Sequence, residues 1–268
     1  MQLALSKQGR DEALAAHQHA FAVERGLQGE AVEREIRPGR QRLGFGRRGA
    51  GPHGLQPALP AVAQLWLSPR LSRLKAELPG VQVSVTALER PPNFGREPFD
   101  LGLFYARAGE RIETDAGAQA IPLVRDRLLP VCSPRLRQPL PSGRPRPPED
   151  LIELLERNGG LHDTVWRDDW QRWLQAVRPG TTAAEAEALA AGPDFSLYSL
   201  ALQAALDGEG VLMGRERLVA PLLAQGKLHA PWGRPKALGD TVMLLVPAHR
   251  KGPLLARQVQ ALQALAAG

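Results

Sequence analysis

Residues 195–214, with the sequence FSLYSLALQAALDGEGVLMG, constrain the fold of this chain more than any other stretch. Ser199 is predicted to be the N-cap of a short apolar helix over residues 200–206, because its hydroxyl can accept from the unpaired N–H groups of the first turn. Gly208 suits the left-handed conformation that ends a helix, and residues 211–213 then form a brief buried strand. In α/β folds this arrangement presents backbone donors to a small ligand. The alternative interpretation is an ordinary strand-connecting helix.

The composition indicates a folded chain with many loops. Of its 268 residues, 43% are hydrophobic, and 24 prolines and 27 glycines break up the regular structure. No apolar run approaches the roughly 18 residues that cross a bilayer, and residues 1–10 lack the apolar core of a signal peptide. The single cysteine, Cys132, excludes an internal disulfide and argues against a cysteine-based metal site. We therefore expect a cytoplasmic protein without a membrane partner, a metal or another cofactor.

The formal charge of +6 is weak evidence for contact with DNA. The basic residues are mostly arginines scattered among Pro, Gly and Ala, and no basic helix interleaved with aromatic residues stands out. The sequence also lacks a G-x-S-x-G elbow, a phosphate-binding loop and an H-E-x-x-H helix. We expect no catalytic residues and no enzymatic activity.

Strand and helix patterns alternate from about Leu55 onward, as in an α/β protein. Residues 81–85 alternate strictly between apolar and polar, which predicts a strand with one buried face. The predicted α/β domain covers residues 54–268 and has two α/β subdomains joined by two crossover strands. Subdomain I would comprise residues 54–131 and 241–268, and subdomain II residues 132–240.

Three motifs resemble the effector-binding domain of LysR-type transcriptional regulators, in the branch that contains the glycine-cleavage activator. They are the S-L-A-L-Q-A-A-L-x-G-x-G-V-x-x-G pattern at residues 199–214, W-L-S-P-R-L at residues 66–71, and P-V-C-S-P at residues 130–134. The resemblance implies the periplasmic-binding-protein type II architecture and control of transcription through a small-molecule effector. Pro69 is expected to kink or divide the first helix.

By the same resemblance, the effector would lie in the cleft between the subdomains. Many family members have Ser or Thr where Ala61 and Leu88 stand, so we expect an unusually apolar pocket that disfavours a simple acidic effector. The positions implied to line the pocket are Ala61, Leu88, Tyr105, Cys132, Ser133, Asp163, Thr164, Ser199 and Met213.

Several candidates also have a structural interpretation. Cys132 is expected to be a small buried hydrophobic residue, because nothing near it in sequence would lower its pKa. The pair His162 and Asp163 lacks a nucleophile or second base, so a structural role is favoured. Asp168 and Asp169 are predicted to be a solvated helix start that favours the helix dipole. The nearby tryptophans at 166, 170 and 173 are expected in the core, on one helical face.

Residues 1–53 are atypical for this family and are predicted to be disordered, because residues 37–53 are rich in Arg and Gly. They show neither a helix-turn-helix nor a long dimerising helix, so we expect DNA binding only if an N-terminal module is present. A lost reading frame or a divergent N-terminus would explain this. Two other functions remain open: a free-standing solute-binding protein of the same fold, and a truncated partner that forms mixed oligomers with full-length regulators.

Overall fold

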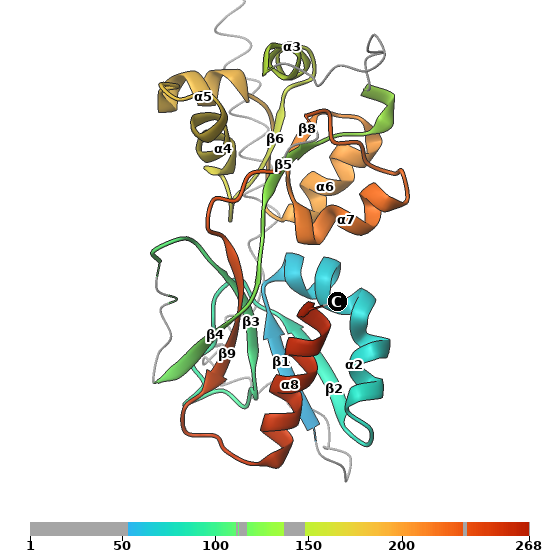
Figure 1. Ribbon diagram of the computed structural model, residues 1–268, viewed down its shortest axis with the longest axis vertical. Coiled ribbons are helices and arrows are strands. Elements are labelled where there is room, and N and C mark those ends of the chain that lie inside the picture. Colours follow the sequence, from blue (N-terminus) through green and yellow to red (C-terminus); the bar gives the residue numbers. More distant parts are fainter. Residues whose placement is uncertain (1–52, 111, 113–116, 137–147, 233–234, 268) are drawn as a thin grey trace, which may run out of the picture. The chain divides into compact units, whose positions relative to one another are not determined.

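A computed structural model describes residues 53–110, 112, 117–136, 148–232 and 235–267, which form two mixed sheets with helices (Figure 1). The predicted N-terminal segment 1–53 lies, except for its last residue, outside the described residues. The five-stranded sheet has the order β2-β1-β3-β9-β4, and the four-stranded sheet the order β5-β8-β6-β7. In chain order the elements are β1 (His53–Ala58), η1 (Val62–Leu67), η2 (Ser68–Arg70), α2 (Leu71–Glu77), β2 (Gln82–Ala87), β3 (Gly102–Ala106), β4 (Ala118–Arg125), β5 (Leu128–Val131), η3 (Pro134–Leu136), α3 (Pro148–Asn158), β6 (Gly160–Asp163), α4 (Asp169–Val177), α5 (Ala183–Leu189), β7 (Asp194–Phe195), α6 (Tyr198–Asp207), β8 (Val211–Arg215), α7 (Glu216–Ala224), β9 (Thr241–Pro247) and α8 (Pro253–Ala267).

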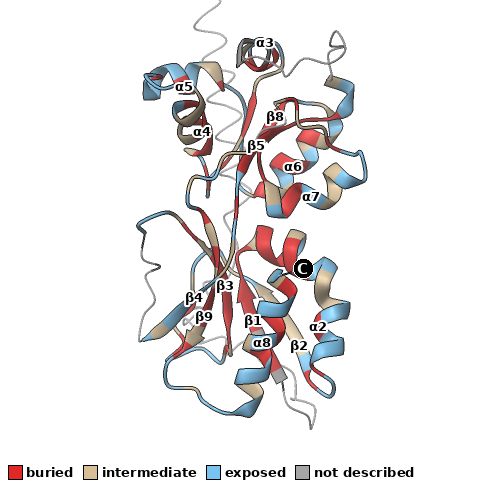
Figure 2. Cartoon of the chain, in the orientation of Figure 1, coloured by how far each residue is buried: buried red, intermediate tan, exposed pale blue. Residues whose placement is uncertain are grey.

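The five-stranded sheet is the core of subdomain I. Strand β1 pairs in parallel with β2 and β3, while β9 runs antiparallel to β3 and β4. Helices α2 and α8 pack against each other and cover one face of this sheet (Figure 1). Buried residues follow the strands and the inner helix faces, whereas the outer faces of α2 and α8 are exposed (Figure 2). The edge strand β2 has no fully buried residue. The alternation of apolar and polar residues in this strand therefore corresponds to a face that is only partly covered.

The helical segment after β1 is divided as the proline predicted. It consists of the π-helix η1, the 3-10 helix η2 and the α-helix α2. Pro69 has no N–H to donate to the preceding turn, which forces the change of helical geometry. The Ser68 hydroxyl instead donates to the Ala63 carbonyl at 2.7 Å, and Arg70 donates to the Trp66 carbonyl at 3.0 Å. Trp66 itself is buried and anchors the segment on the sheet.

Strand β8 separates two apolar layers in subdomain II. Val211 and Met213 face the core formed with α3, α4 and α5, while Leu212, between them, faces the core formed with α6 and α7. This alternation follows from the two-residue period of a strand. The core on the α6 and α7 side continues into subdomain I, where α7 contacts η1.

The predicted helix in residues 195–214 is present, but its expected cap is wrong. Helix α6 begins at Tyr198, its N-cap is Leu197, and no side chain caps it, so Ser199 lies within the first turn. Tyr198 is buried and its hydroxyl accepts a hydrogen bond from the Arg215 N–H at 3.1 Å, which fixes the helix start before Ser199. The C-terminal end of α6 is as predicted, because Gly208 has the left-handed φ of 89°.

The two segments that connect the sheets lie side by side. The Asp126 N–H donates to the Asp240 carbonyl at 2.8 Å, and Leu128 exchanges backbone hydrogen bonds with Lys236. Strand β5 already pairs with β8 of the second sheet, so the chain crosses at Asp126 rather than at the expected boundary after Val131. The consecutive strands β4 and β5 therefore belong to different sheets. Among the described residues, no helix has the length and hydrophobicity needed to span a bilayer.

Candidate ligand-binding cleft

A cleft of about 750 Å³ opens where the carboxyl ends of the first sheet's parallel strands meet residues of the second subdomain. In α/β proteins this edge of the sheet is the usual place for a ligand. The residues that line the cleft are Leu59, Glu89, Arg90, Pro91, Phe104, Tyr105, Arg107, Glu110, Ile112, Val165 and Trp166. This lining includes both acidic and basic side chains, so the candidate cleft is more polar than the pocket that the sequence led us to expect.

Aromatic side chains from both subdomains meet at this cleft. Tyr105 of β3 and Trp166 of the second subdomain make an edge-to-face contact with ring centroids 5.2 Å apart, and Trp166 makes the same contact with Tyr198. Behind them lies the guanidinium of Arg215, which is 3.9 Å from the Trp166 ring centroid and 4.8 Å from that of Tyr105. Cation–π contacts of this kind are strengthened when water is excluded.

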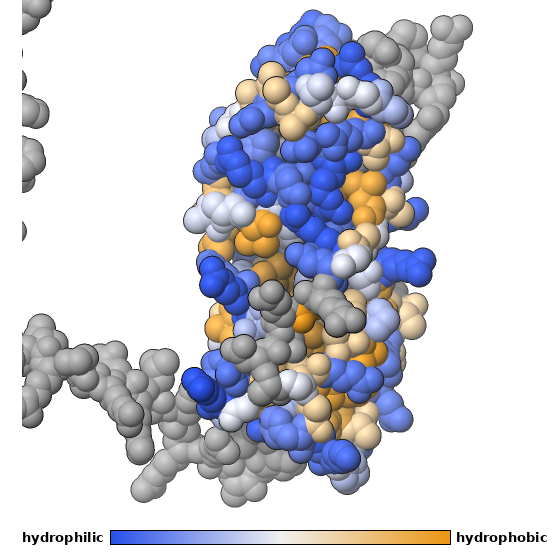
Figure 3. Space-filling view, turned by 90° about the vertical axis from the view of Figure 1, so that its left-hand side faces the viewer, coloured by the Kyte–Doolittle hydropathy of each residue, from blue (hydrophilic) through white to orange (hydrophobic). Residues whose placement is uncertain are grey.

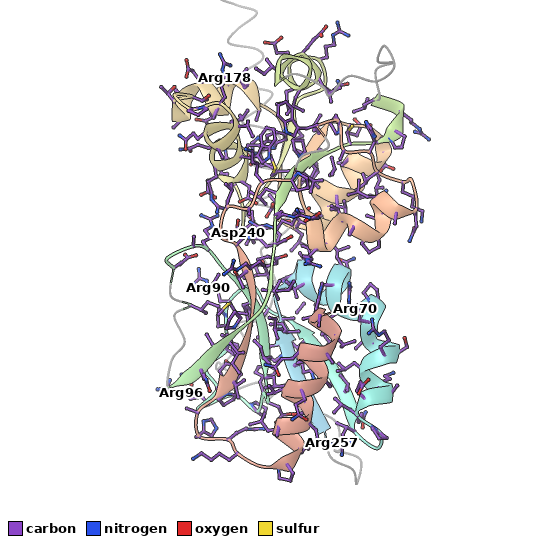
Figure 4. All side chains as sticks on the ribbon, viewed as in Figure 1. Arg70, Arg90, Arg96, Arg178, Asp240 and Arg257 are labelled. Atoms are coloured by element: carbon purple, nitrogen blue, oxygen red, sulfur yellow. The ribbon has the colours of Figure 1, made fainter. Side chains whose placement is uncertain are left out.

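Arg215 belongs to a buried ion network that the sequence analysis missed. Its side chain is 0% exposed and its Nη2 donates to Asp169 Oδ2 at 2.6 Å, while its Nη1 lies 3.8 Å from Asp240 Oδ1. Arg172 of α4 contacts both carboxylates, at 2.9 Å and 3.0 Å. Asp240 lies where the second crossover segment enters the first subdomain (Figure 4). The network therefore ties α4 and β8 to the crossover.

Asp169 is consequently not the solvated helix start that the sequence indicated. It is buried, and desolvation raises its pKa to about 6 despite the opposing charge of Arg215, with the neighbouring Asp240 adding to the increase. The sequence held a signal for this burial: Asp169 and the buried Trp173 are four residues apart and share one face of α4. Trp166, by contrast, precedes α4, so the three tryptophans are buried but do not share a helical face.

Tyr105 connects the cleft to the first crossover. Its hydroxyl donates to Asp126 Oδ2 at 2.6 Å, and Asp126 Oδ1 accepts from the backbone N–H groups of Arg127 and Arg217 at 2.8 Å and 2.9 Å. Burial raises the pKa of Asp126, although these hydrogen bonds oppose the shift. A ligand that contacts Tyr105 would therefore act on a group bonded to the crossover.

A second ion pair links the two subdomains at the edge of the cleft. Arg107, just after β3, donates to both carboxylate oxygens of Asp168, just before α4, at 2.7 Å and 2.5 Å. The side chains of Arg107 and Asp168 are 32% and 42% exposed. Both residues also line a smaller cavity of about 470 Å³ beside α4 and α5. Arg107 therefore lies where the two cavities meet.

The structure gathers few of the predicted site residues around the cleft. Tyr105 lines the larger cavity, and Thr164 lines the smaller one. The other predicted positions line neither of these two cavities: Ala61, Leu88, Cys132, Ser133, Asp163, Ser199 and Met213. Asp163 lies beneath the cleft, where its Oδ1 accepts from the N–H groups of Val165 and Trp166. A turn-stabilising role for Asp163 is thus evident from its contacts.

The remaining predicted positions occupy ordinary structural places. Ala61 is buried at the start of η1, and Leu88 is partly buried just after β2. Cys132 and Ser133 are buried directly after β5, and Met213 is buried in β8. His162 contacts the Ala190 carbonyl through Nε2 at 2.6 Å, which fits a structural role. Within the described part of the chain, no three His, Cys, Asp or Glu side chains are placed to hold a metal ion.

Comparison with known proteins places this fold in a family. The family model "LysR substrate binding domain" matches residues 58–267, so the chain belongs to the LysR family and carries its effector-binding domain. The chain is 33% identical over 178 residues to the glycine cleavage system transcriptional activator of Escherichia coli K12, covering 65% of this chain and 52% of that protein. It is 32% identical over 203 residues to the HTH-type transcriptional regulator TrpI of Pseudomonas aeruginosa, covering 76% and 64%. The chain thus spans about half the length of the first of these relatives.

Solved structures agree on the fold. The effector domain of the transcriptional regulator AmpR of Pseudomonas aeruginosa superposes with a TM-score of 0.62 at 20% identity, over 81% of this chain and 96% of that domain. The regulatory domain of CrgA from Neisseria meningitidis gives a TM-score of 0.58 at 18% identity, over 80% and 99%. The predicted two-subdomain, periplasmic-binding-protein type II-like architecture is confirmed.

Proposed function

We propose that this chain is the effector-sensing part of a cytoplasmic LysR-type transcriptional regulator, in which a small molecule enters the cleft and changes how the two subdomains are held. The observation that carries the proposal is that both subdomains line one cleft and that its wall residue Tyr105 is hydrogen-bonded to Asp126 at the crossover. A ligand that binds one relative position of the subdomains more tightly shifts the population toward it.

The output of this change would pass through oligomers. Family membership supports assembly with a second copy or with a related full-length regulator, and DNA contact would require an N-terminal module. The relatives matched along the domain are transcriptional regulators, which supports a regulatory rather than a catalytic role. A sequence-specific gel shift produced by the purified chain would extend the proposal to direct DNA binding.

The proposal is tested by screening a metabolite library against the purified chain for raised melting temperature and for a change in tryptophan fluorescence. A compound that binds the cleft should alter the emission of Trp166, which lines it, and this part of the signal should be lost in Trp166→Phe. Trp232→Phe is the matched control, because Trp232 packs against Trp173 in the other core. A library in which no compound gives a Trp166-dependent response would contradict the proposal.

A further inference from the structure

We propose that the cleft selects effectors that carry a single carboxylate, and that Arg107 binds this carboxylate in exchange for Asp168. This inference rests on the proposed sensing function and adds the chemical class of the effector. Arg107 is the starting point because it lines both cavities and its partner comes from the opposite subdomain.

The geometry of the pair matches the recognition of a free carboxylate. The two Nη groups of Arg107 donate to the two oxygens of Asp168 in the side-by-side arrangement that guanidinium and carboxylate groups prefer. A ligand carboxylate presents the same two oxygens in the same plane. Asp168 therefore occupies the place that a ligand carboxylate would take on Arg107.

Because the Arg107–Asp168 pair is partly exposed, replacing Asp168 by a ligand carboxylate costs little free energy. Arg107 and Asp168 are both about a third or more exposed, and ion pairs in contact with solvent contribute little to stability. Asp168 can also return to water when it is displaced. The neighbouring Arg215 differs, because it and Asp169 are 0% and 3% exposed, and separating them would strand buried charges. Arg107 is thus the exchangeable arginine and Arg215 the fixed one.

The charges around the cleft limit the ligand to one carboxylate. Arg90 and Arg107 are balanced by Glu89 and Glu110, and Glu110 Oε2 also accepts a hydrogen bond from the backbone N–H of Arg107 at 3.2 Å. Arg90 lies in the first subdomain, on its exposed surface (Figure 4). A ligand with several negative charges would meet the two glutamates as well as the arginines. The balance favours a monocarboxylate.

The remainder of the ligand would be apolar or aromatic. Between the charged positions the cleft is lined by Leu59, Phe104, Tyr105, Val165 and Trp166. The side of the molecule in Figure 3 shows hydrophilic residues interspersed with hydrophobic ones. Aromatic rings offer flat faces and edges against which a planar ligand packs.

Isothermal titration calorimetry with benzoate and its neutral counterpart benzamide tests the inference. The wild-type chain should bind benzoate about tenfold or more tightly than benzamide, as charge-assisted bidentate hydrogen bonds allow. Asp168→Asn should tighten benzoate binding up to about fivefold, because it removes the internal competitor, and should leave benzamide unchanged. Arg107→Gln should remove the preference for benzoate, and Arg107→Lys should retain part of it.

The control is Glu216→Gln, which disrupts a similar bidentate pair with Arg127 that lines neither cavity. It should leave both affinities unchanged. The inference is overturned when wild type binds benzoate no better than benzamide, when neither compound binds, or when Asp168→Asn weakens benzoate binding. Saturable benzamide binding without a benzoate preference would leave the sensing function standing. When neither compound binds, the library screen, which does not depend on a carboxylate, decides the sensing function separately.

Discussion

The buried arginine gives the sharpest prediction about stability. Replacing Arg215 by Met keeps much of the side-chain volume but leaves Asp169 and Asp240 with Arg172 as their remaining close cation in the network. Removing one partner of a buried ion pair typically costs about 3–5 kcal/mol. The same replacement at Arg107 disrupts a pair that is partly exposed, which typically costs about 1 kcal/mol or less. The two variants therefore separate the effect of burial from that of charge.

The assay is urea unfolding at pH 7.5, followed by circular dichroism. Arg215→Met should lower the free energy of unfolding by about 3–5 kcal/mol and the melting temperature by roughly 6–20 °C. The loss should shrink as the pH falls toward about 6, because Arg215 lowers the pKa of Asp169 and its removal lets Asp169 take up a proton at a higher pH. If Arg215→Met loses no more stability than Arg107→Met at pH 7.5, the network does not stabilise the fold as described.

Three further predictions concern single residues. The pKa of Asp169 is raised from 3.8 to about 6 by burial, so the folded chain binds the proton more tightly than the unfolded chain. The stabilisation of the fold by protonated Asp169 should be fully present below pH 3.8 and should be lost as the pH rises through 6. It is measured as the difference between wild type and Asp169→Asn in how the free energy of unfolding changes with pH. Thr182→Ala should cost about 1 kcal/mol because Thr182 caps α5, whereas Ser199→Ala should change the free energy of unfolding by less than about 0.5 kcal/mol. Gly214→Ala should destabilise the domain by about 1–3 kcal/mol, measured by urea unfolding, because its Cβ would lie 2.9 Å from the Leu129 carbonyl oxygen.

Much of the fold was predictable because it rests on local periodicity. The strand expected at residues 81–85 is observed at Gln82–Ala87, and the strand expected at residues 211–213 is observed at Val211–Arg215. In each case the apolar spacing of a few residues was enough. The cap at Ser199 was wrong because the helix start is set by the distant contact of Tyr198 with Arg215. A sequence pattern over one segment does not contain that contact.

The candidate site was harder to predict, because its residues meet through tertiary packing. Arg215 is the last residue of the apolar strand β8 and looked unremarkable, yet it lies against Trp166 and Tyr105 from other parts of the chain. The resemblance pointed to the cleft and to Tyr105, but family positions do not reveal which charged side chains face one another. The pairing of Arg107 with Asp168 spans 61 positions in sequence. Such pairs become visible when both sheets are in place.

The most direct test of the account is whether a cleft ligand changes the separation of the two subdomains. Spin labels on Lys75→Cys in α2 and Arg178→Cys after α4 would report this distance by double electron–electron resonance, since both positions are exposed and Cys132 is buried. We predict that a saturating amount of the tightest library compound shifts the distance distribution, and that Trp166→Phe weakens this response. An unchanged distribution in the presence of bound ligand would contradict the account.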